Sequence, residues 1–284
     1  RNNTAMASLS SVNSRALLGA AVGGGIAALT ARSLATWLHQ RFFKRGLQVE
    51  PPHPSWQPGQ RQSMPYPEKW VALDPAAQKS CYPLMISAYV PRPIAFVSTL
   101  SASGEGNLAP FSYSGIFSHD PPVIAVSIVS SSVNPDGKKD TLANIDATGE
   151  FVVNIMSTWF VEAANHTCAN FPRGQDEFDE AGLTRVASHV VKPPRVAESA
   201  IHFECKLLHR QEIKNKAGKV TCTVVFGEAV LIHCAESIVE GVDEGRPQVN
   251  FEKLKPLGRL GGNTYAVVTE TFDLARPDRN ANKT

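Results

Sequence analysis

The feature that most constrains the fold is a series of β-rich runs joined by short turns. Residues 94–100 (IAFVSTL) and 107–117 (NLAPFSYSGIF) are separated by SASGEG, whose two glycines permit the backbone of a hairpin turn. Residues 122–130 carry apolar side chains on both faces, which is typical of a central strand covered on both sides. Further strands are predicted at 151–157, 202–213, 219–234 and 264–272, with a hairpin loop at 214–218.

Only short helices are predicted between these runs. Residues 134–137 (NPDG) form a turn, and a helix follows with Asp140 or Thr141 as its N-cap and Gly149 as its end. A second helix is expected over 158–170, and residues 171–200 are expected to be mostly loop with one helical turn. Because strands and helices do not alternate as in a parallel sheet, we predict an all-β protein with accessory helices, built as an antiparallel barrel.

The charge of the chain is unevenly distributed. Residues 1–49 hold six positive side chains and no acid, so the rest of this chain of net charge +2 is acidic. That division argues against nucleic-acid binding, which would place a basic patch within the folded part. The uncharged stretch 16–31 is shorter than the roughly 20 residues of a membrane-spanning helix. A mitochondrial presequence, a membrane anchor or secretory signal, and an uninformative extension all remain open.

We therefore expect a mitochondrial or membrane-associated protein with possible membrane contact through its N-terminal segment, and a cytoplasmic protein is the alternative. Residues 50–68 contain six prolines, which exclude a helix or a central strand and indicate a semi-rigid linker. The predicted organisation is a targeting or membrane-associated segment, a Pro-rich linker, one folded domain and a C-terminal tail, over residues 1–49, 50–74, 75–275 and 276–284.

No motif for catalysis by side chains alone is present. The five cysteines form no C-x-x-C pair, so neither a disulfide framework nor a metal site is expected. Dinucleotide-binding, Walker A, zinc-protease and nucleophile-elbow motifs are also missing, so a cofactor would have to supply the reactive group. The most informative segment is 127–145, where a strand leads into a turn with Lys138 and Lys139 and then a helix start. Free N–H groups, the helix dipole and a lysine suit a phosphate, and a solvated basic turn is the alternative.

Several blocks of the sequence, in order, resemble the flavin reductase-like family of FMN-binding split-barrel proteins. The resemblance covers roughly residues 80–272 and leaves residues 1–70 outside it. It implies a six-stranded antiparallel split β-barrel, a homodimer, and noncovalent FMN near the dimer interface. It also implies NADH or NADPH as co-substrate and, in many relatives, a partner monooxygenase or other electron acceptor. The blocks are 91–128 (PRPIAFVSTLSASGEG…), 138–157 (KKDTLANIDATGEFVVNIMS), 177–186 (EFDEAGLTRV), 190–207 (VVKPPRVAESAIHFECKL) and 257–266 (LGRLGGNTYA).

Matched position by position, the resemblance implies a set of FMN contacts. The implied neighbours of the isoalloxazine ring are Ala109, Pro110, Ser112 and Tyr113, and the rim of the site is formed by Arg92, Pro93, Ser98 and Thr99. Ser127 would face the ribityl chain. The implied phosphate ligands are Lys139, Asp140 and Thr141. Asn107, on the same predicted strand as Ala109, is a further candidate. The turn 133–137 departs from the family as an insertion before the lysines.

Other residues have two possible roles. His119 could assist nicotinamide binding or protonate reduced flavin, or it could be a structural loop residue. His166 and Cys168 could form a nucleophilic site, but no Asp or Glu spacing supports that role, so both are expected to be packing residues of the helix 158–170 against the barrel. The block from Arg259 to Tyr265 either contacts flavin or closes a tight turn.

Two functions follow from these observations. The first is NAD(P)H-dependent flavin reduction by hydride transfer to the flavin N5. The second is a membrane-tethered flavin-binding electron relay, or a storage or interaction module, without its own nicotinamide site. The fold alone does not separate them.

Overall fold

The computed structural model describes residues 47–66 and 69–277. The targeting or membrane segment predicted for residues 1–49 thus lies almost entirely outside the described residues, and so does most of the predicted tail. Within the described ranges, no helix is long and apolar enough to cross a membrane. Neither helix nor strand occurs at residues 49–66 or 69–81. The assignment of residues 50–74 as a linker stays a prediction.

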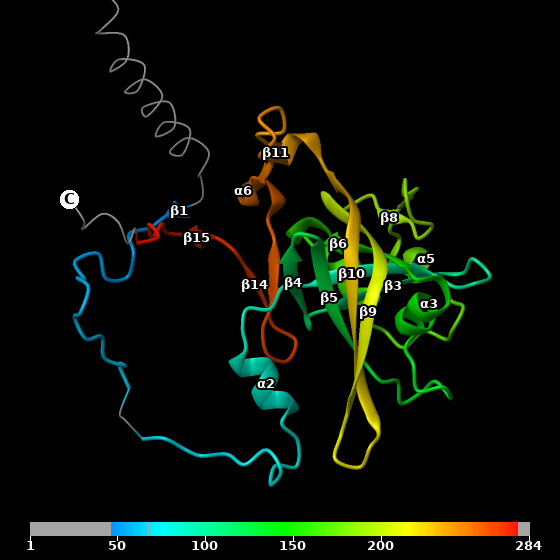
Figure 1. The fold of residues 1–284 in the computed structure, drawn as a ribbon, viewed down its shortest axis with the longest axis horizontal. Coiled ribbons are helices and arrows are strands. Elements are labelled where there is room, and N and C mark those ends of the chain that lie inside the picture. Colours follow the sequence, from blue (N-terminus) through cyan, green and yellow to red (C-terminus); the bar gives the residue numbers. More distant parts are fainter. Residues whose placement is uncertain (1–46, 67–68, 278–284) are drawn as a thin grey trace, which may run out of the picture. The chain divides into compact units, whose positions relative to one another are not determined.

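A seven-stranded sheet forms the centre of the fold (Figure 1). Its order is β3-β2-β6-β9-β10-β5-β4, and every neighbouring pair is antiparallel. The strands are β2 (Ala95–Leu100), β3 (Gly106–Phe111), β4 (Ser114–His119), β5 (Pro122–Val129), β6 (Glu150–Ile155), β9 (Ile201–Lys214) and β10 (Val220–Cys234).

The first and last strands of this order are two parts of one stretch of chain. Only Ser112 and Tyr113 separate β3 from β4, and the Ser127 N–H donates to the Tyr113 carbonyl at 2.8 Å, which holds this bend against β5. The sheet therefore begins and ends at a single bent strand. Counted in this way it is the predicted six-stranded antiparallel barrel, and the strand predicted over 107–117 is its bent member.

An apolar core fills the interior of the barrel. It includes Ile128, Phe151 and Val225, which are fully buried, and it is closed by apolar residues of α3 (Asp140–Thr148). At Gly227, a Cβ would lie 2.2 Å from Cζ of Phe151. Glycine is thus required where β10 crosses the Phe151 ring.

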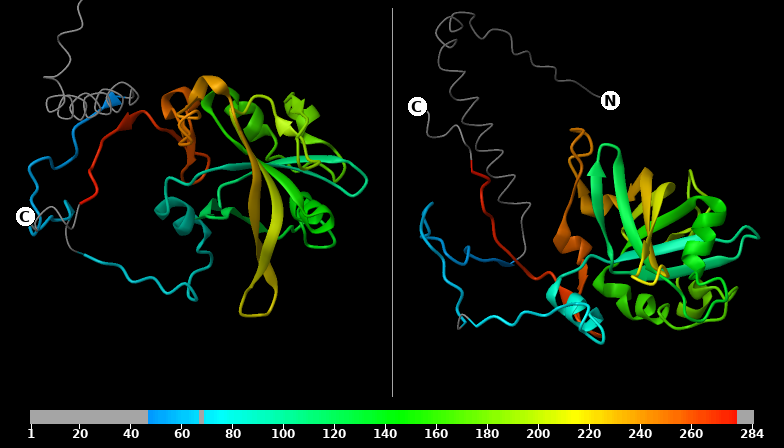
Figure 2. Two further views of the ribbon diagram at one scale, coloured as in Figure 1. Left: turned by 45° about the horizontal axis from the view of Figure 1, so that its top comes forward. Right: turned by 60° about the horizontal axis from the view of Figure 1, so that its bottom comes forward.

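The longest strands, β9 and β10, form the predicted hairpin of residues 202–234. They pair from Ile201 with Cys234 to Lys214 with Val220, with three register shifts. The end of the hairpin reaches beyond the rest of the sheet (Figure 1 and the left view of Figure 2), and its residues there are mostly exposed.

The helix predicted after residue 139 is present, but its N-cap prediction was wrong. The N-cap of α3 is Lys139, which has an extended backbone, and Asp140 and Thr141 are the first helical residues. Both side chains bond elsewhere, Asp140 to Arg173 and Thr141 to Asn107, so neither is available as a cap. Gly149 ends the helix with φ of 69°, as predicted.

The helix predicted over 158–170 is shorter than expected. A 3₁₀ turn, η1 (Thr158–Phe160), leads into α4 (Val161–His166), and the chain then continues as a loop. The next helix, α5 (Glu177–Ala181), is the single helical turn predicted within 171–200.

The strand predicted over 264–272 lies outside the barrel. It is divided into β14 (Tyr265–Val267) and β15 (Glu270–Thr271), which pair with β13 (Leu257–Arg259) and β1 (Leu47–Gln48). The remaining short elements are α2 (Tyr82–Ala88), β7 (Arg185–Val186), β8 (Arg195–Val196), η2 (Glu236–Ile238), β11 (Val239–Glu240), β12 (Gln248–Val249) and α6 (Phe251–Leu254).

Candidate functional site

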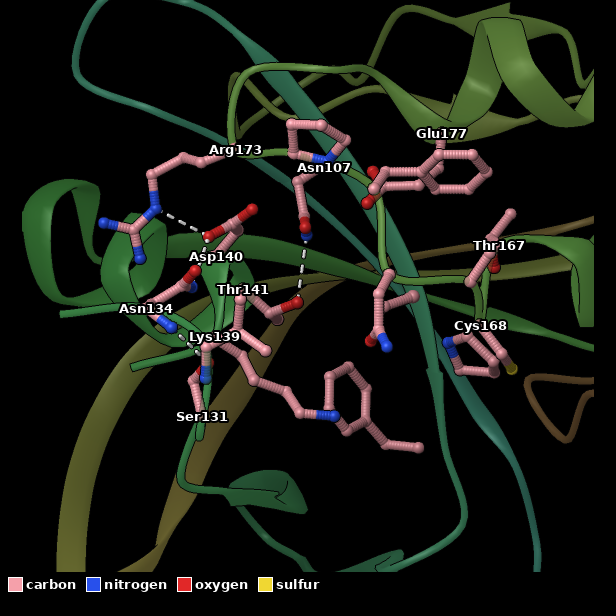
Figure 3. A pocket seen from close by; sticks show the side chains of 18 residues that line it. Asn107, Ser131, Asn134, Lys139, Asp140, Thr141, Thr167, Cys168, Arg173 and Glu177 are labelled. Carbon is pink, nitrogen blue, oxygen red and sulfur yellow. Dashed lines mark hydrogen bonds and ion pairs between the residues drawn. The ribbon is translucent and has the colours of Figure 1, made fainter. Parts of the chain in front are cut away.

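A pocket of about 500 Å³ lies between β3, the start of α3, the loop after α4, and α5 (Figure 3). Its wall combines polar and apolar groups from five separate segments of the chain. The lining residues are Asn107, Ala109, Pro110, Phe111, Ser131, Val133, Asn134, Lys139, Asp140, Thr141, Thr167, Cys168, Ala169, Asn170, Phe171, Pro172, Arg173 and Glu177.

The start of α3 supplies the groups that suit an anion. Within the described part of the chain, the Lys139 ammonium group forms no ion pair or hydrogen bond, and its side chain extends into the pocket (Figure 3). The backbone N–H groups of Asp140 and Thr141 also lack an acceptor among the described residues. Lys138 differs, because its Nζ lies 2.6 Å from the Asp146 carboxylate. Lys139 is therefore the lysine available to a ligand.

Arg173 connects two acids at the same end of the pocket. Its Nε donates to Oδ1 of Asp140 at 2.7 Å, and its Nη1 lies 3.1 Å from Oδ2 of Asp136. The hydrogen bond from Arg173 lowers the pKa of Asp136. Arg173 thus offsets the negative charge that Asp140 brings to the helix start. Sequence reasoning missed this residue, because it lies 33 positions from Asp140 in a loop without a motif.

Asn107 makes hydrogen bonds that hold the pocket wall in place beside the start of α3. Its Nδ2 donates to the hydroxyl oxygens of Thr141 at 2.9 Å and Thr99 at 3.0 Å, and Asn144 also donates to Thr99. Thr99 is fully buried behind Asn107 and does not line the pocket. The predicted residues Asn107 and Thr141 therefore meet in the pocket, and Thr99 supports them from the core.

Glu177, at the start of α5, contributes a buried carboxyl group. The residue is 8% exposed, and its Oε2 accepts a hydrogen bond from the Leu108 N–H at 2.9 Å. Burial raises the pKa of Glu177 to about 7, and the nearby Asp176 and Asp140 act in the same direction. Glu177 is the first residue of the family block 177–186, and no role was predicted for it from the sequence.

The loop after α4 forms the remaining wall and corrects the prediction for Cys168. This residue lies beyond the end of the helix, is exposed and lines the pocket, so it is not a helix packing residue. Desolvation raises the pKa of its thiol, an effect that Arg259 and Lys139 oppose. His166, the last residue of α4, is also exposed, and its ring contacts the ring of Phe171.

Six of the predicted cofactor contacts line this pocket. Ala109 and Pro110 belong to β3 and form its wall beside Asn107, while the phosphate candidates stand at the start of α3. The six are Asn107, Ala109, Pro110, Lys139, Asp140 and Thr141. The structure therefore brings together the two family blocks that the sequence analysis assigned to the flavin ring and to its phosphate.

The predicted rim residues Arg92, Pro93 and Ser98 lie outside this pocket. Arg92 is buried, and its guanidinium donates to the carbonyl oxygens of Ile86, Tyr89 and Leu260, which ties α2 to the turn after β13. Arg92 and Pro93 line a separate surface hollow. Ser98 is fully buried and donates to the Pro194 carbonyl. In this chain Arg92 and Ser98 hold the framework together, and a contact with flavin stays a prediction.

The other predicted contacts gather at the bend between β3 and β4. Ser112 accepts a hydrogen bond from Nε of Arg92 at 3.4 Å, Tyr113 is 38% exposed, and Ser127 pairs with it through the backbone. His119 is exposed at the end of β4 and does not line the pocket. Roles for these residues in binding flavin or nicotinamide stay predictions.

The block from Arg259 to Tyr265 forms the tight turn between β13 and β14. The Arg259 guanidinium lies 4.3 Å above the Tyr265 ring, and the Tyr265 hydroxyl donates to the Asn165 side chain at 2.8 Å. The turn is thereby attached to α4. A direct flavin contact from this block stays a prediction.

Comparison with known proteins decides the family. The model of the flavin reductase like domain matches residues 87–246, which contain every residue of the pocket. The chain belongs to the flavin reductase-like family. An uncharacterized protein of Halalkalibacterium halodurans is 39% identical over 211 residues, which are 74% of this chain and 97% of the relative.

Among solved structures of this kind, the chain is similar to nitrilotriacetate monooxygenase component B from Bacillus cereus. The two are 35% identical with a TM-score of 0.68, over 73% of this chain and 100% of that one. The 2-nitrobenzoate 2-nitroreductase of Pseudomonas fluorescens is 28% identical with a TM-score of 0.64, over 74% of this chain and 98% of the other. The predicted family and split-barrel fold are confirmed, and flavin-related redox chemistry is the functional class of the chain.

Proposed function

We propose that this protein is an NAD(P)H-dependent flavin reductase that holds FMN in the pocket between β3 and α3. The observation that carries the proposal is the Lys139 ammonium group beside the N–H groups of Asp140 and Thr141, none of which has a partner among the described residues, in one pocket with the β3 wall. A phosphomonoester has a charge of about −1.5 to −2 at pH 7 and three acceptor oxygens, so this donor set fits its phosphate.

The chain's own residues bind and orient the cofactor. Lys139 and the first turn of α3 would hold the phosphate, and Arg173 keeps the adjacent Asp140 from repelling it. The hydrogen bond from Asn107 fixes the position of the Thr141 hydroxyl group at the phosphate end of the pocket. Ala109 and Pro110 would provide the apolar wall for the ring. When bound, FMN would supply the group that accepts a hydride from NADH or NADPH, and the protein would supply placement rather than a dedicated acid or base.

A partner for the reduced flavin is part of the proposal. The related protein from Bacillus cereus is named as a monooxygenase component, which supports transfer of electrons to a partner monooxygenase. A homodimer is supported by exposed apolar side chains on β4, where Ile116 is 81% exposed and Phe117 is 63% exposed.

For localisation we propose a mitochondrial or membrane-associated site. Residues 6–50 fused to a fluorescent reporter should direct it there, and a cytosolic signal would refute this.

The absorption spectrum of the purified protein tests the cofactor, because bound oxidised flavin is yellow. Anaerobic mixing of the flavin-loaded protein with NADH or NADPH should then bleach the flavin absorbance. If flavin binds but neither nucleotide bleaches it, the proposed reductase activity is wrong, and an electron relay without a nicotinamide site takes its place. If neither FMN nor FAD binds, the pocket assignment is wrong.

A further inference from the structure

We propose that Glu177 is a positioning residue that couples occupation of this pocket by a phosphorylated ligand to the uptake of a proton. The inference rests on the proposed function, because it places the ligand's phosphate at the start of α3. It concerns a buried acid for which the proposed reaction has no other use.

Glu177 is buried in the pocket wall. Its carboxylate accepts a hydrogen bond from the Leu108 N–H and lies across the pocket from the backbone of Lys139 (Figure 3). Among the described residues, no lysine, arginine or histidine forms an ion pair with it. A buried carboxylate without such a partner is destabilised by the loss of its hydration.

The charged groups around Glu177 favour its neutral form. Burial and the two neighbouring acids Asp176 and Asp140 together raise its pKa to about 7, although backbone hydrogen bonds oppose the change. Arg173 is already engaged by Asp136 and Asp140. The Cys168 thiol has a pKa raised above its ordinary value of 9.0, so it stays neutral near pH 7. The titratable and charged groups that line this part of the pocket are Lys139, Asp140, Cys168, Arg173 and Glu177. Asp176 precedes Glu177 in the chain, lies outside the lining and is paired with Arg185, whose Nη2 is 2.7 Å from its Oδ2.

Asp140, the first residue of α3, already raises the pKa of Glu177 through its negative charge. A dianionic phosphate bound at the same helix start adds negative charge there and raises the pKa of Glu177 again. The ligand then binds the protonated form better, so a proton is taken up on binding wherever the pH lies between the free and the bound pKa. Affinity falls as the pH rises above 7. The phosphate of FMN is itself ionised above about pH 7, since its second pKa is about 6, and it does not contribute in this range.

Glu177→Gln isolates the charge from the structural role. The amide oxygen of glutamine can still accept the hydrogen bond from Leu108, while the side chain no longer titrates. Glu180→Gln is the matched control, because Glu180 is exposed on the same helix and its side chain bonds only to Gln175 among the described residues. Dissociation constants for FMN and riboflavin would be measured at pH 7.0 and 8.5. Calorimetry in two buffers of different ionisation enthalpy would count protons directly on the unmodified protein.

For the unmodified protein and Glu180→Gln, we expect the FMN dissociation constant to rise about fourfold from pH 7.0 to 8.5, if binding raises the pKa by one unit. Glu177→Gln should show no such rise, and riboflavin should show none in any of the three proteins. An equal rise in Glu177→Gln, or no proton uptake by calorimetry, overturns the inference while leaving the proposed FMN site intact. If no protein binds FMN at either pH, the proposed function fails, and the inference fails with it.

Discussion

Replacement of Lys139 by alanine tests the phosphate site directly. A charge-assisted hydrogen bond from a lysine is worth about 1.5–3 kcal/mol, and each 1.4 kcal/mol changes a dissociation constant tenfold. Lys139 is exposed, so solvent screening places the loss at the lower end of this range. The N–H groups in the first turn of α3 remain in the variant and keep part of the site. We therefore expect Lys139→Ala to weaken FMN binding about tenfold, with little effect on riboflavin, which has no phosphate.

Lys138→Ala is the matched control for this experiment. The Lys138 ammonium group is paired with Asp146, which also contacts Arg210 at 3.2 Å, so its removal leaves Asp146 with a partner. We expect its FMN affinity to stay within about threefold of the unmodified protein. Fluorescence titration of both flavins into the three proteins measures these effects. Equal losses for FMN and riboflavin in Lys139→Ala would show that this lysine supports the fold, and an unchanged FMN affinity would place the phosphate elsewhere.

Three further predictions concern the fold. Burial disfavours ionisation of Glu204, but hydrogen bonds from three backbone N–H groups and from His233 lower its pKa to about 2. The stabilisation of the fold by ionised Glu204 is therefore complete above the ordinary pKa of 4.5 and is lost as the pH falls toward 2. Between pH 5 and pH 3, the melting temperature of the unmodified protein should drop more than that of Glu204→Gln. Gly227→Ala should lower the free energy of unfolding by about 1–3 kcal/mol in urea titrations, because its Cβ overlaps a core ring, whereas Gly115→Ala meets only an ordinary contact at 3.8 Å and should change it less. A chain starting near residue 70 should stay soluble and bind flavin like the full chain, and an insoluble or colourless product would show that the linker is part of the folded unit.

Much of the barrel could be predicted because its signals are local. The β2–β3 hairpin follows from the glycines of residues 101–106, and Gly149 ends α3 where expected. The N-cap of α3 was mispredicted, because Asp140 and Thr141 bond to residues distant in sequence. The predicted strand over 264–272 has the right composition for a strand, but the barrel is already complete without it. Local patterns predict that a strand exists and do not specify the sheet it joins.

The site was predictable in part for the same reason. Lys139 and Thr141 were found because a turn followed by a helix start is visible in the sequence, and Ala109 and Pro110 came from the family resemblance. Arg173 and Glu177 enter the pocket only through the folding of the segment after α4. The helix predicted over 158–170 included the start of this segment, so Cys168 was wrongly assigned to a helix. No short pattern marks a loop that closes a pocket from the opposite side.

The order of strands in the barrel has a consequence for how the chain folds. The β9–β10 hairpin is local in sequence and can form early, because closing its short loop costs little entropy. The other edge of β10 pairs with β5, where Val225 lies opposite Val126. These two residues are separated in the chain by a long segment that includes α3, β6 and α5. Folding should therefore be limited by this distant pairing, and a rate typical of barrels with non-local contacts is expected rather than that of a helical protein. Until that step is complete, the edge of β5 that pairs with β10 is unpaired, and the partly folded chain is most exposed to aggregation at this stage.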